Sequence, residues 1–256
     1  MASAKLFALF TRRAGPRAND LGRMSLGDLI VAYATYPTVI VYVLLCLASI
    51  AGAVALGALA NPLRCLAAVV AAVLIYPAVE YTLHRFVLHA RWLYKHPMTA
   101  ALWKRIHFDH HQDPNRLDVL FGSLSNTLPT IVLIGLPIGW LIGGPSAALS
   151  ALAAAFVIMC VYEFCHCVQH LNYTPRSAWL RRIKKHHMAH HFHNETGNFG
   201  ITSTFIDRIV GTGYEDRETR PRSTHVYDLG YDQAEAARFP WVAALSQPAP
   251  DRPNAR

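Results

Sequence analysis

Two groups of histidines with identical spacing are the residues of this chain best suited to chemistry. The pattern H-x-x-H-H occurs twice, at His107, His110 and His111 and again at His187, His190 and His191. Fourteen of the 256 residues are histidine, so chance would produce such a triplet at roughly one starting position in six thousand. On a helix, positions i, i+3 and i+4 share a face, so each triplet is expected to direct three imidazoles toward one point. Because neutral imidazole is the commonest metal-binding side chain, the pattern predicts a polyhistidine metal site.

Two further histidine pairs stand beside long apolar runs. His166 and His170 are four residues apart and share a helix face. His84 and His89 are five residues apart, about 140° on an ideal helix. Both can bind one centre only if the helix end unwinds or the metals lie to either side. Ten imidazoles exceed what one tetrahedral or octahedral ion can use, so two ions are predicted. The predicted ligands are His84, His89, His107, His110, His111, His166, His170, His187, His190 and His191.

The four remaining histidines are given lesser roles. His96 precedes a proline and is interpreted as a surface or packing residue, and His225 is interpreted as solvated. His186 and His193 flank the second triplet and are interpreted as neighbours of the ligands. The thiols of Cys165 and Cys167, two residues apart, point away from each other on a helix, so they are interpreted as small apolar side chains rather than as ligands.

The type of ligand limits which metals are expected at the site but does not identify one metal. Structural zinc sites favour thiolates and four closed positions, whereas an all-nitrogen pair of sites with open positions suits iron or another redox metal. Imidazole also binds zinc well, so both metals stay open at this point.

The elements that must position these histidines are apolar runs of membrane length. The chain is 53% hydrophobic and only 16% charged, and such content gathered into long runs indicates a membrane protein. Val39 to Ala60 predicts a first span, and Cys65 to Val79 begins a second. A third run is expected at 124–141, where Pro129 and Pro137 interrupt it. A Gly-Gly-Pro turn at 143–145 separates it from a fourth run at 147–162.

The predicted fold is therefore all-α and integral to the membrane, with two transmembrane helical hairpins (four spans) and a cytosolic helical cap that holds the histidines. Of the 24 Lys and Arg residues, only Arg64 falls in a hairpin on the other side, and this bias places the basic side in the cytoplasm.

One domain is expected over 1–256, with an amino-terminal surface segment at 1–35, spans and first histidines at 36–165, second histidines at 166–215 and an irregular tail at 216–256. Five cysteines and no secretory pattern argue against a disulfide framework. Abundant alanine and arginine without an organelle retention signal favours a bacterial inner membrane.

The net charge of +8 is interpreted as attraction to an anionic membrane leaflet rather than to nucleic acid, because no recognition motif accompanies it. Arg181, Arg182, Lys184 and Lys185 precede the second triplet. They could dock an acidic electron carrier, bind anionic headgroups or form a plain solvated face. Four carboxylates near the histidines are candidates to orient the imidazoles, namely Glu80, Asp109, Glu163 and Asp207.

The spacing of the ten histidines, from about residue 75 to about residue 215, resembles the fatty acid hydroxylase and sterol desaturase superfamily. The stretches 198–203 (NFGITS) and 207–212 (DRIVGT) resemble the end of the catalytic domain of fatty acid 2-hydroxylases. The resemblance implies a membrane oxygenase with two iron ions, in which zinc can substitute, that uses O2 as co-substrate. Fungal and animal members often carry a fused cytochrome b5 domain, for which no stretch is found here. An external electron donor such as cytochrome b5 or ferredoxin is therefore expected.

The predicted function is hydroxylation of a C–H bond of a fatty acyl chain, at the 2-position, in a membrane lipid. Within the same superfamily, a sterol, sphingoid-base or carotenoid oxidase or desaturase is the alternative. A zinc-dependent membrane lipid hydrolase would want a general-base carboxylate beside a three-ligand site, and no H-E-x-x-H occurs. A metal carrier would need ionisable groups within the spans, and the first two runs offer only neutral side chains.

Overall fold

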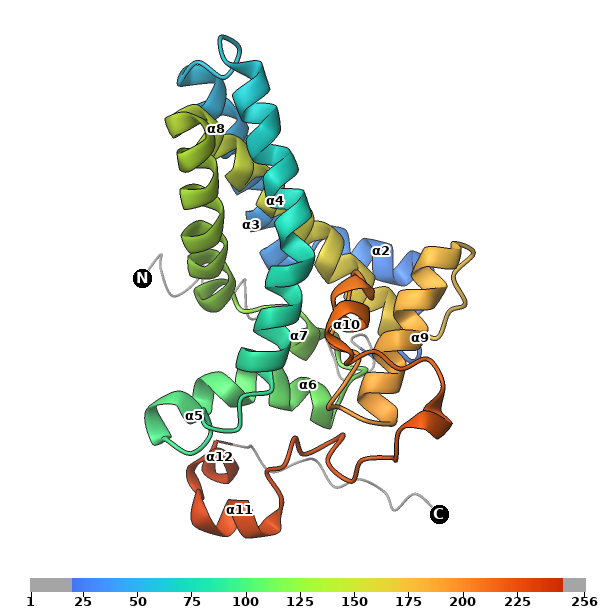
Figure 1. Ribbon diagram of the computed structural model, residues 1–256. Coiled ribbons are helices and arrows are strands. Elements are labelled where there is room, and N and C mark those ends of the chain that lie inside the picture. Colours follow the sequence, from blue (N-terminus) through green and yellow to red (C-terminus); the bar gives the residue numbers. More distant parts are fainter. Residues whose placement is uncertain (1–19, 246–256) are drawn as a thin grey trace.

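The computed structural model describes residues 20–245 (Figure 1). This range is helical, with one isolated β-bridge between Asp20 and Arg116 and no strand. The prediction of an all-α chain is confirmed for these residues. The predicted surface segment at 1–35 falls partly outside them, since residues 1–19 are not described.

Three helices are long and apolar enough to cross a membrane: α3 (Pro37–Ala55), α4 (Pro62–Leu83), which continues into the π-helix η1 (His84–Leu88), and α8 (Leu124–His170). Both α3 and α4 begin on a proline, which suits the first helical turn because its missing N–H would have no partner there. The 19 residues of α3 extend about 28 Å, close to the thickness of a hydrocarbon core. The chain is therefore a membrane protein.

Helix α8 consists of two limbs that meet at Gly143 and Gly144. Neither glycine has helical backbone angles, and Gly144 has a φ of 72°, which costs glycine little. The limbs lie against each other, since a Cβ at Gly139 would come within 2.5 Å of the Cα of Ala148. The break expected at 143–145 is thus present. The predicted interruption at Pro129 and Pro137 is not, because both prolines lie inside the first limb without ending it.

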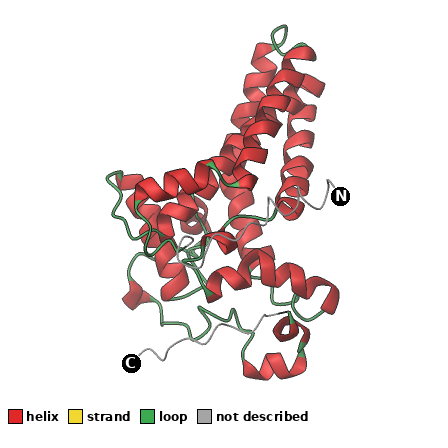
Figure 2. Ribbon diagram, turned by 180° about the vertical axis from the view of Figure 1, so that it is seen from behind, coloured by secondary structure: helices red, strands yellow, loops and turns green. Residues whose placement is uncertain are grey.

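The shorter helices gather at one end of the long ones and form a helical cap (Figures 1 and 2). They are α2 (Leu26–Ala34), α5 (Pro97–Trp103), the π-helix η2 (Lys104–Phe108), α6 (Asp109–Gln112), α7 (Leu117–Leu120), α9 (Ala178–Phe192), α10 (Phe205–Val210), the 3-10 helix η3 (Arg217–Thr219), α11 (Gln233–Arg238) and α12 (Trp241–Ala244).

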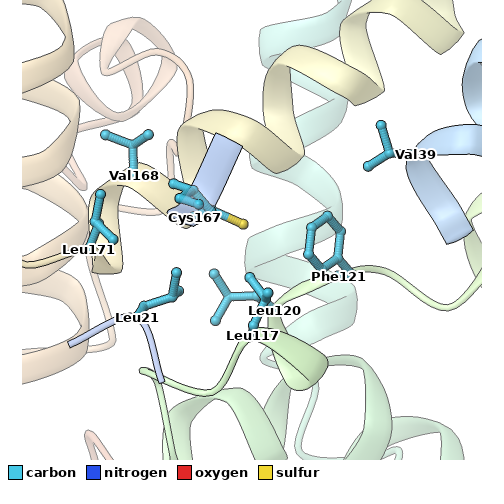
Figure 3. Packing of buried hydrophobic residues seen from close by; sticks show 9 residues of the cluster. Leu21, Val39, Leu117, Leu120, Phe121, Cys167, Val168 and Leu171 are labelled. Atoms are coloured by element: carbon cyan, nitrogen blue, oxygen red, sulfur yellow. The ribbon is translucent and has the colours of Figure 1, made fainter. Parts of the chain in front are cut away.

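A buried apolar cluster fixes the cap to the end of α8 (Figure 3). Leu21 from the amino-terminal side meets Leu117, Leu120 and Phe121 around α7, and all pack against the last turns of α8 near Cys167. Burial of apolar side chains stabilises such a junction by about 1.5–3 kcal/mol for each large residue. This cluster holds the last turn of α8, and with it two of the histidines, in a fixed position.

The carboxyl-terminal segment differs from the irregular tail predicted for 216–256. Up to residue 245 it contains η3, α11 and α12, and it packs under α5. Tyr231 and Val242 are buried there with Tyr94 and Trp103, and Trp241 Nε1 donates to the backbone oxygen of Tyr94 at 2.7 Å. The charged and proline-rich composition conceals these few large apolar residues, and they are enough to order the segment.

Candidate metal centre

A π-helical turn brings His84 and His89 together. The N–H of His89 donates to the carbonyl of His84, five residues earlier, at 3.2 Å. One extra residue per turn places His89 above His84, and their Nε2 atoms lie 3.3 Å apart. A π turn is wound more loosely than an α turn, so the helix end unwinds, which was one of the two options that an ideal α-helix left open, and both rings reach one group.

The first triplet is divided between two centres. It lies on η2 and α6, where His107 and His111 bring their Nε2 atoms to 3.0 Å while His110 points into a different group. The second triplet on α9 divides in the same way, with His190 in one group and His187 in the other. The expectation that each triplet directs three imidazoles toward one point is therefore wrong. An i, i+3, i+4 face is broad enough to serve two neighbouring points.

The first group, here called the α4 centre, contains His84, His89, His107, His111 and His190. The Nε2 atom of His107 lies 3.0 Å from that of His84 and 2.9 Å from that of His89. His89 is in turn 3.1 Å from the Nε2 atom of His190. Three segments that are far apart in the sequence contribute to this one cluster.

The second group, here called the α8 centre, contains His110, His166, His170, His187 and His191. The Nε2 atom of His166 lies 3.1 Å from those of His110 and His187, and that of His170 lies 3.0 Å from His187. Ligand atoms of His111, His190 and His191 also lie within 4.8 Å of one another. The two centres are therefore neighbours, and the ten predicted residues converge.

Backbone carbonyls fix the tautomers in the α4 centre. The Nδ1 atom of His111 faces the carbonyl of Val226 at 2.6 Å, that of His190 faces Gly197 at 2.7 Å, and that of His84 faces the carbonyl of Phe199. A carbonyl only accepts, so Nδ1 carries the proton and Nε2 presents a lone pair toward the centre. Lone pairs only about 3 Å apart repel unless a cation lies between them. This arrangement fits a metal ion.

Burial keeps these imidazoles neutral. Nine of the ten are buried and His89 is half-buried. Desolvation, followed by the neighbouring imidazoles, holds the pKa of His107, His110 and His187 well below the ordinary value. It lowers the pKa of His111 to about 3. Neutral imidazole is the form that binds metal.

The four carboxylates proposed to orient imidazoles do not bond to any of the ten within residues 20–245. Glu80 accepts from the N–H groups of Ile201 and Thr202 at 2.6 and 3.0 Å. Asp207 accepts from the N–H groups of Phe199 and Gly200 at 2.9 and 2.6 Å. These two carboxylates act indirectly, because they hold the loop whose carbonyls contact the histidines.

The other two carboxylates have different partners. Asp109 pairs with Lys104, and Glu163 accepts from the N–H of Gly122 at 3.0 Å. Orientation by backbone carbonyls had no signal in the sequence, since any residue type supplies a carbonyl.

The four remaining histidines lie outside both centres. The ring of His96 accepts from the N–H of Met98 at the start of α5, and His225 pairs with Asp228 at 2.9 Å. His186 bonds to Asp207 at 3.0 Å and His193 to the carbonyl of Arg220 at 2.7 Å. None of the four belongs to a histidine group within residues 20–245, and His225, predicted to be solvated, is half-buried beside Asp228.

A cavity of about 480 Å³, here called the lipid cavity, extends from both centres between α4 and the limbs of α8. Its histidine end is formed by His84, His107, His110 and His166. Along α4 it reaches Ala72, twelve residues and about 18 Å from His84. Apolar side chains such as Ile134 and Ile138 line most of it. A long apolar chain fits this space with one end at the imidazoles.

Of the four residues of the predicted basic patch, Lys184 is bonded to the backbone instead of being a free surface charge. Lys184 donates to the carbonyls of Val168 and Tyr173 at 3.3 and 2.9 Å and also to that of Leu171. It thereby caps the carboxyl end of α8. Arg181, Arg182 and Lys185 stay exposed and line a surface pocket of about 280 Å³ that includes His186.

Comparisons with known proteins agree with the site. The profile of the family described as fatty acid hydroxylase matches residues 69–212. The ceramide very long chain fatty acid hydroxylase SCS7 of Saccharomyces cerevisiae is 33% identical over 147 residues, which are 55% of this chain and 36% of that protein. The dihydroceramide fatty acyl 2-hydroxylase FAH2 of Arabidopsis thaliana is 30% identical over 149 residues, 55% of this chain and 57% of that protein. The matches thus span from about a third to just over half of the length of these relatives.

A solved structure is also similar. The structure described as full-length scs7p, with only the hydroxylase domain visible, has a TM-score of 0.54 and 25% identity. The similarity covers 80% of this chain and 71% of that one.

Proposed function

Because the chain belongs to the fatty acid hydroxylase family, we propose that it is a membrane enzyme that hydroxylates a fatty acyl chain, at the 2-position, with O2. The observation that carries the proposal is the convergence of ten imidazoles, four of which line one end of a largely apolar cavity. The names of the relatives from yeast and Arabidopsis support acyl chains, and ceramide-linked ones in particular, as the substrate class.

We assign one iron ion to the α4 centre and one to the α8 centre. When bound, the irons would supply the redox chemistry by which one atom of O2 enters the C–H bond and the other leaves as water, with two electrons and two protons consumed. Zinc would bind the same imidazoles but has no redox chemistry, so it would be a substitute.

The residues of the chain have the tasks of binding and orientation. The lipid cavity would hold the acyl chain with its reacting carbon next to His84, His107, His110 and His166. Its apolar lining would keep bulk water from the reacting carbon. Carbonyls of Gly197, Phe199 and Val226 would keep three imidazoles in the metal-binding tautomer.

The proposed topology has four crossings, made by α3, α4 and the two limbs of α8, with the cap in the cytoplasm. The position of Arg64 at the start of α4, away from the basic cap, supports this orientation. A bacterial inner membrane is the proposed location, on the composition of the chain.

An acidic one-electron carrier, such as cytochrome b5 or ferredoxin, is the proposed partner. Arg181, Arg182 and Lys185 would attract it, since they are exposed and lie beside the second histidine triplet on α9.

Lipid mass spectrometry tests the proposal. The chain would be expressed in a host that lacks 2-hydroxylated lipids, with the His187→Ala variant and a His225→Ala control. Acyl chains gaining one oxygen at C2 are expected with the wild type and the control, and none with His187→Ala. An altered sterol or a new double bond would instead indicate the alternative oxidase or desaturase. Turnover that persists without oxygen and reductant would indicate a hydrolase.

A further inference from the structure

A second cavity reaches the α4 centre from a different side. It has a volume of about 290 Å³ and shares no lining residue with the lipid cavity. Its lining is Arg85, Phe86, His89, Arg91, Glu195 and Thr196, with Phe199 and Leu229. Most of these residues lie on or just after η1 and on the loop after α9, whereas the lipid cavity is lined mainly by α4 and α8.

His89 connects this cavity to the centre. It is the one histidine of the ten that is only half-buried, and it is also one of the residues that line the second cavity. The ring of Phe199 packs on it with centroids 5.4 Å apart and closes one side. His89 therefore belongs both to the α4 centre and to the wall of this space.

The lining of the second cavity suits water rather than lipid. Arg85, Arg91 and Glu195 supply three charged groups. An acyl chain cannot solvate such groups, whereas water can, so water is the expected occupant of this cavity.

We infer that this second cavity is an aqueous port, through which protons enter and product water leaves while an acyl chain fills the lipid cavity. The inference rests on the proposed hydroxylation. Each turnover converts C–H, O2, two electrons and two protons into C–OH and one water. With the lipid cavity filled, protons and water need a separate route, and the port ends at a half-buried ligand of the centre where they are used.

Small hydrophilic anions should use the same route, which makes azide a suitable probe. In iron-loaded protein, azide binding is followed by its absorbance change in a stopped-flow experiment. Thr196 is exposed at the rim of the port, so a Thr196→Cys variant can be labelled there with a bulky maleimide. The matched control is Ala178→Cys, exposed on the other surface pocket. Wild-type protein treated with the maleimide controls for the five native cysteines.

Labelled Thr196→Cys should bind azide about tenfold more slowly, because entry then requires local opening of the 195–199 loop. The rate of azide binding should be unchanged in labelled Ala178→Cys and in maleimide-treated wild type. It should also be unchanged when substrate fills the lipid cavity. An unchanged rate in labelled Thr196→Cys, or a rate slowed only by substrate, would overturn the inference. Slowed azide entry in a protein that makes no hydroxylated lipid would refute hydroxylation and leave the port in place.

Discussion

His84 and His89 are five residues apart in the sequence, and their Nε2 atoms are 3.3 Å apart in the structure. The π-helical turn η1 makes this possible by adding one residue to the turn. The position that faces His84 is therefore i+5, held by His89, and not the i+4 position used by His166 and His170 on α8.

Moving the imidazole by one residue tests this geometry. The double variant Leu88→His/His89→Ala places a histidine at i+4 and removes the one at i+5. Because the π turn directs position 88 elsewhere, we expect this variant to lose metal from the α4 centre as fully as His89→Ala alone. Metal analysis by mass spectrometry compares the two. Full metal content in the double variant would show that the turn readily returns to α-helical geometry.

The two centres should lose metal separately. His107→Ala removes a proposed ligand of the α4 centre and His170→Ala a proposed ligand of the α8 centre. Each variant is expected to weaken the binding of one ion by about 100-fold or more, since even residues that only contact the ligands change metal affinity by about 10–100-fold. Metal content should fall from two ions per chain toward one, and hydroxylation should be lost in both variants. His96→Ala is the control and should keep both ions; equal loss of both ions from one variant would contradict two separate centres.

Much of the site was predictable from the sequence because metal ligands need particular side chains at particular spacings. The resemblance to fatty acid hydroxylases is confirmed by the family match, and the ten chosen histidines do converge. The division of each triplet was not predictable, because an ideal helix wheel does not show whether a face serves one point or two. The π turns depend on tertiary packing, which local spacing does not encode.

The parts that were missed depend on backbone atoms and on sparse side chains. The carbonyl of Val226 accepts from His111, yet it lies in a segment whose composition suggested an irregular tail. Tyr231 and Val242 order that segment from a few positions. Average composition cannot reveal so small a number of buried contacts.

Asp207 is expected to support the α4 centre from a distance. It accepts from the N–H groups of Phe199 and Gly200 and from His186. Asp207→Asn replaces one acceptor oxygen by a donor, so the loop carbonyl that orients His84 should shift. We expect about 10–100-fold weaker metal binding at this centre, with the α8 centre retained, as measured by metal titration. Unchanged affinity at both centres would remove Asp207 from this role.

The pKa of Asp207 determines the pH range in which its carboxylate stabilises the fold. Burial raises it, but the bonds from His186, Thr212 and Gly200 outweigh burial and hold it below the ordinary value. A lowered pKa means that the stabilisation is complete above about pH 4 and is lost only as the pH falls through the lowered value. The change in unfolding free energy caused by Asp207→Asn should therefore be constant from about pH 6 to about pH 8 when both proteins compared carry His186→Phe, which removes the paired imidazole. A difference that varies steeply in this range would contradict the assignment.

Lys184 should contribute stability rather than charge at the surface. Its ammonium bonds to three carbonyls at the end of α8, and Lys184→Met would leave them without that donor. We expect a loss of about 1–3 kcal/mol, seen as a lower Tm in detergent with metal content retained. Lys185→Met, exposed one residue further on, is the matched control and should leave the Tm unchanged. If Lys185→Met lowers the Tm equally, the loss of stability comes from the removed positive charge and not from the bonds of Lys184 to the carboxyl end of α8.

Gly135 should set how deep an acyl chain can enter. It lines the lipid cavity, and a Cβ there would meet Leu152 and Ala155 only at 3.7–3.8 Å, an ordinary contact. Gly135→Ala is therefore expected to fold and to accept nearly the same chains, which makes it the control. Gly135→Phe would add a ring beside Ala155, which also lines the cavity, and narrow it there, so long chains should be excluded while short ones still reach the metal centres. The measurement is the distribution of chain lengths among the 2-hydroxylated products of the three proteins. A shift toward shorter chains in Gly135→Phe alone, with both ions retained, is the expected result. An equal loss of all chain lengths in a folded, metal-loaded Gly135→Phe variant would mean that the chain does not lie along this cavity.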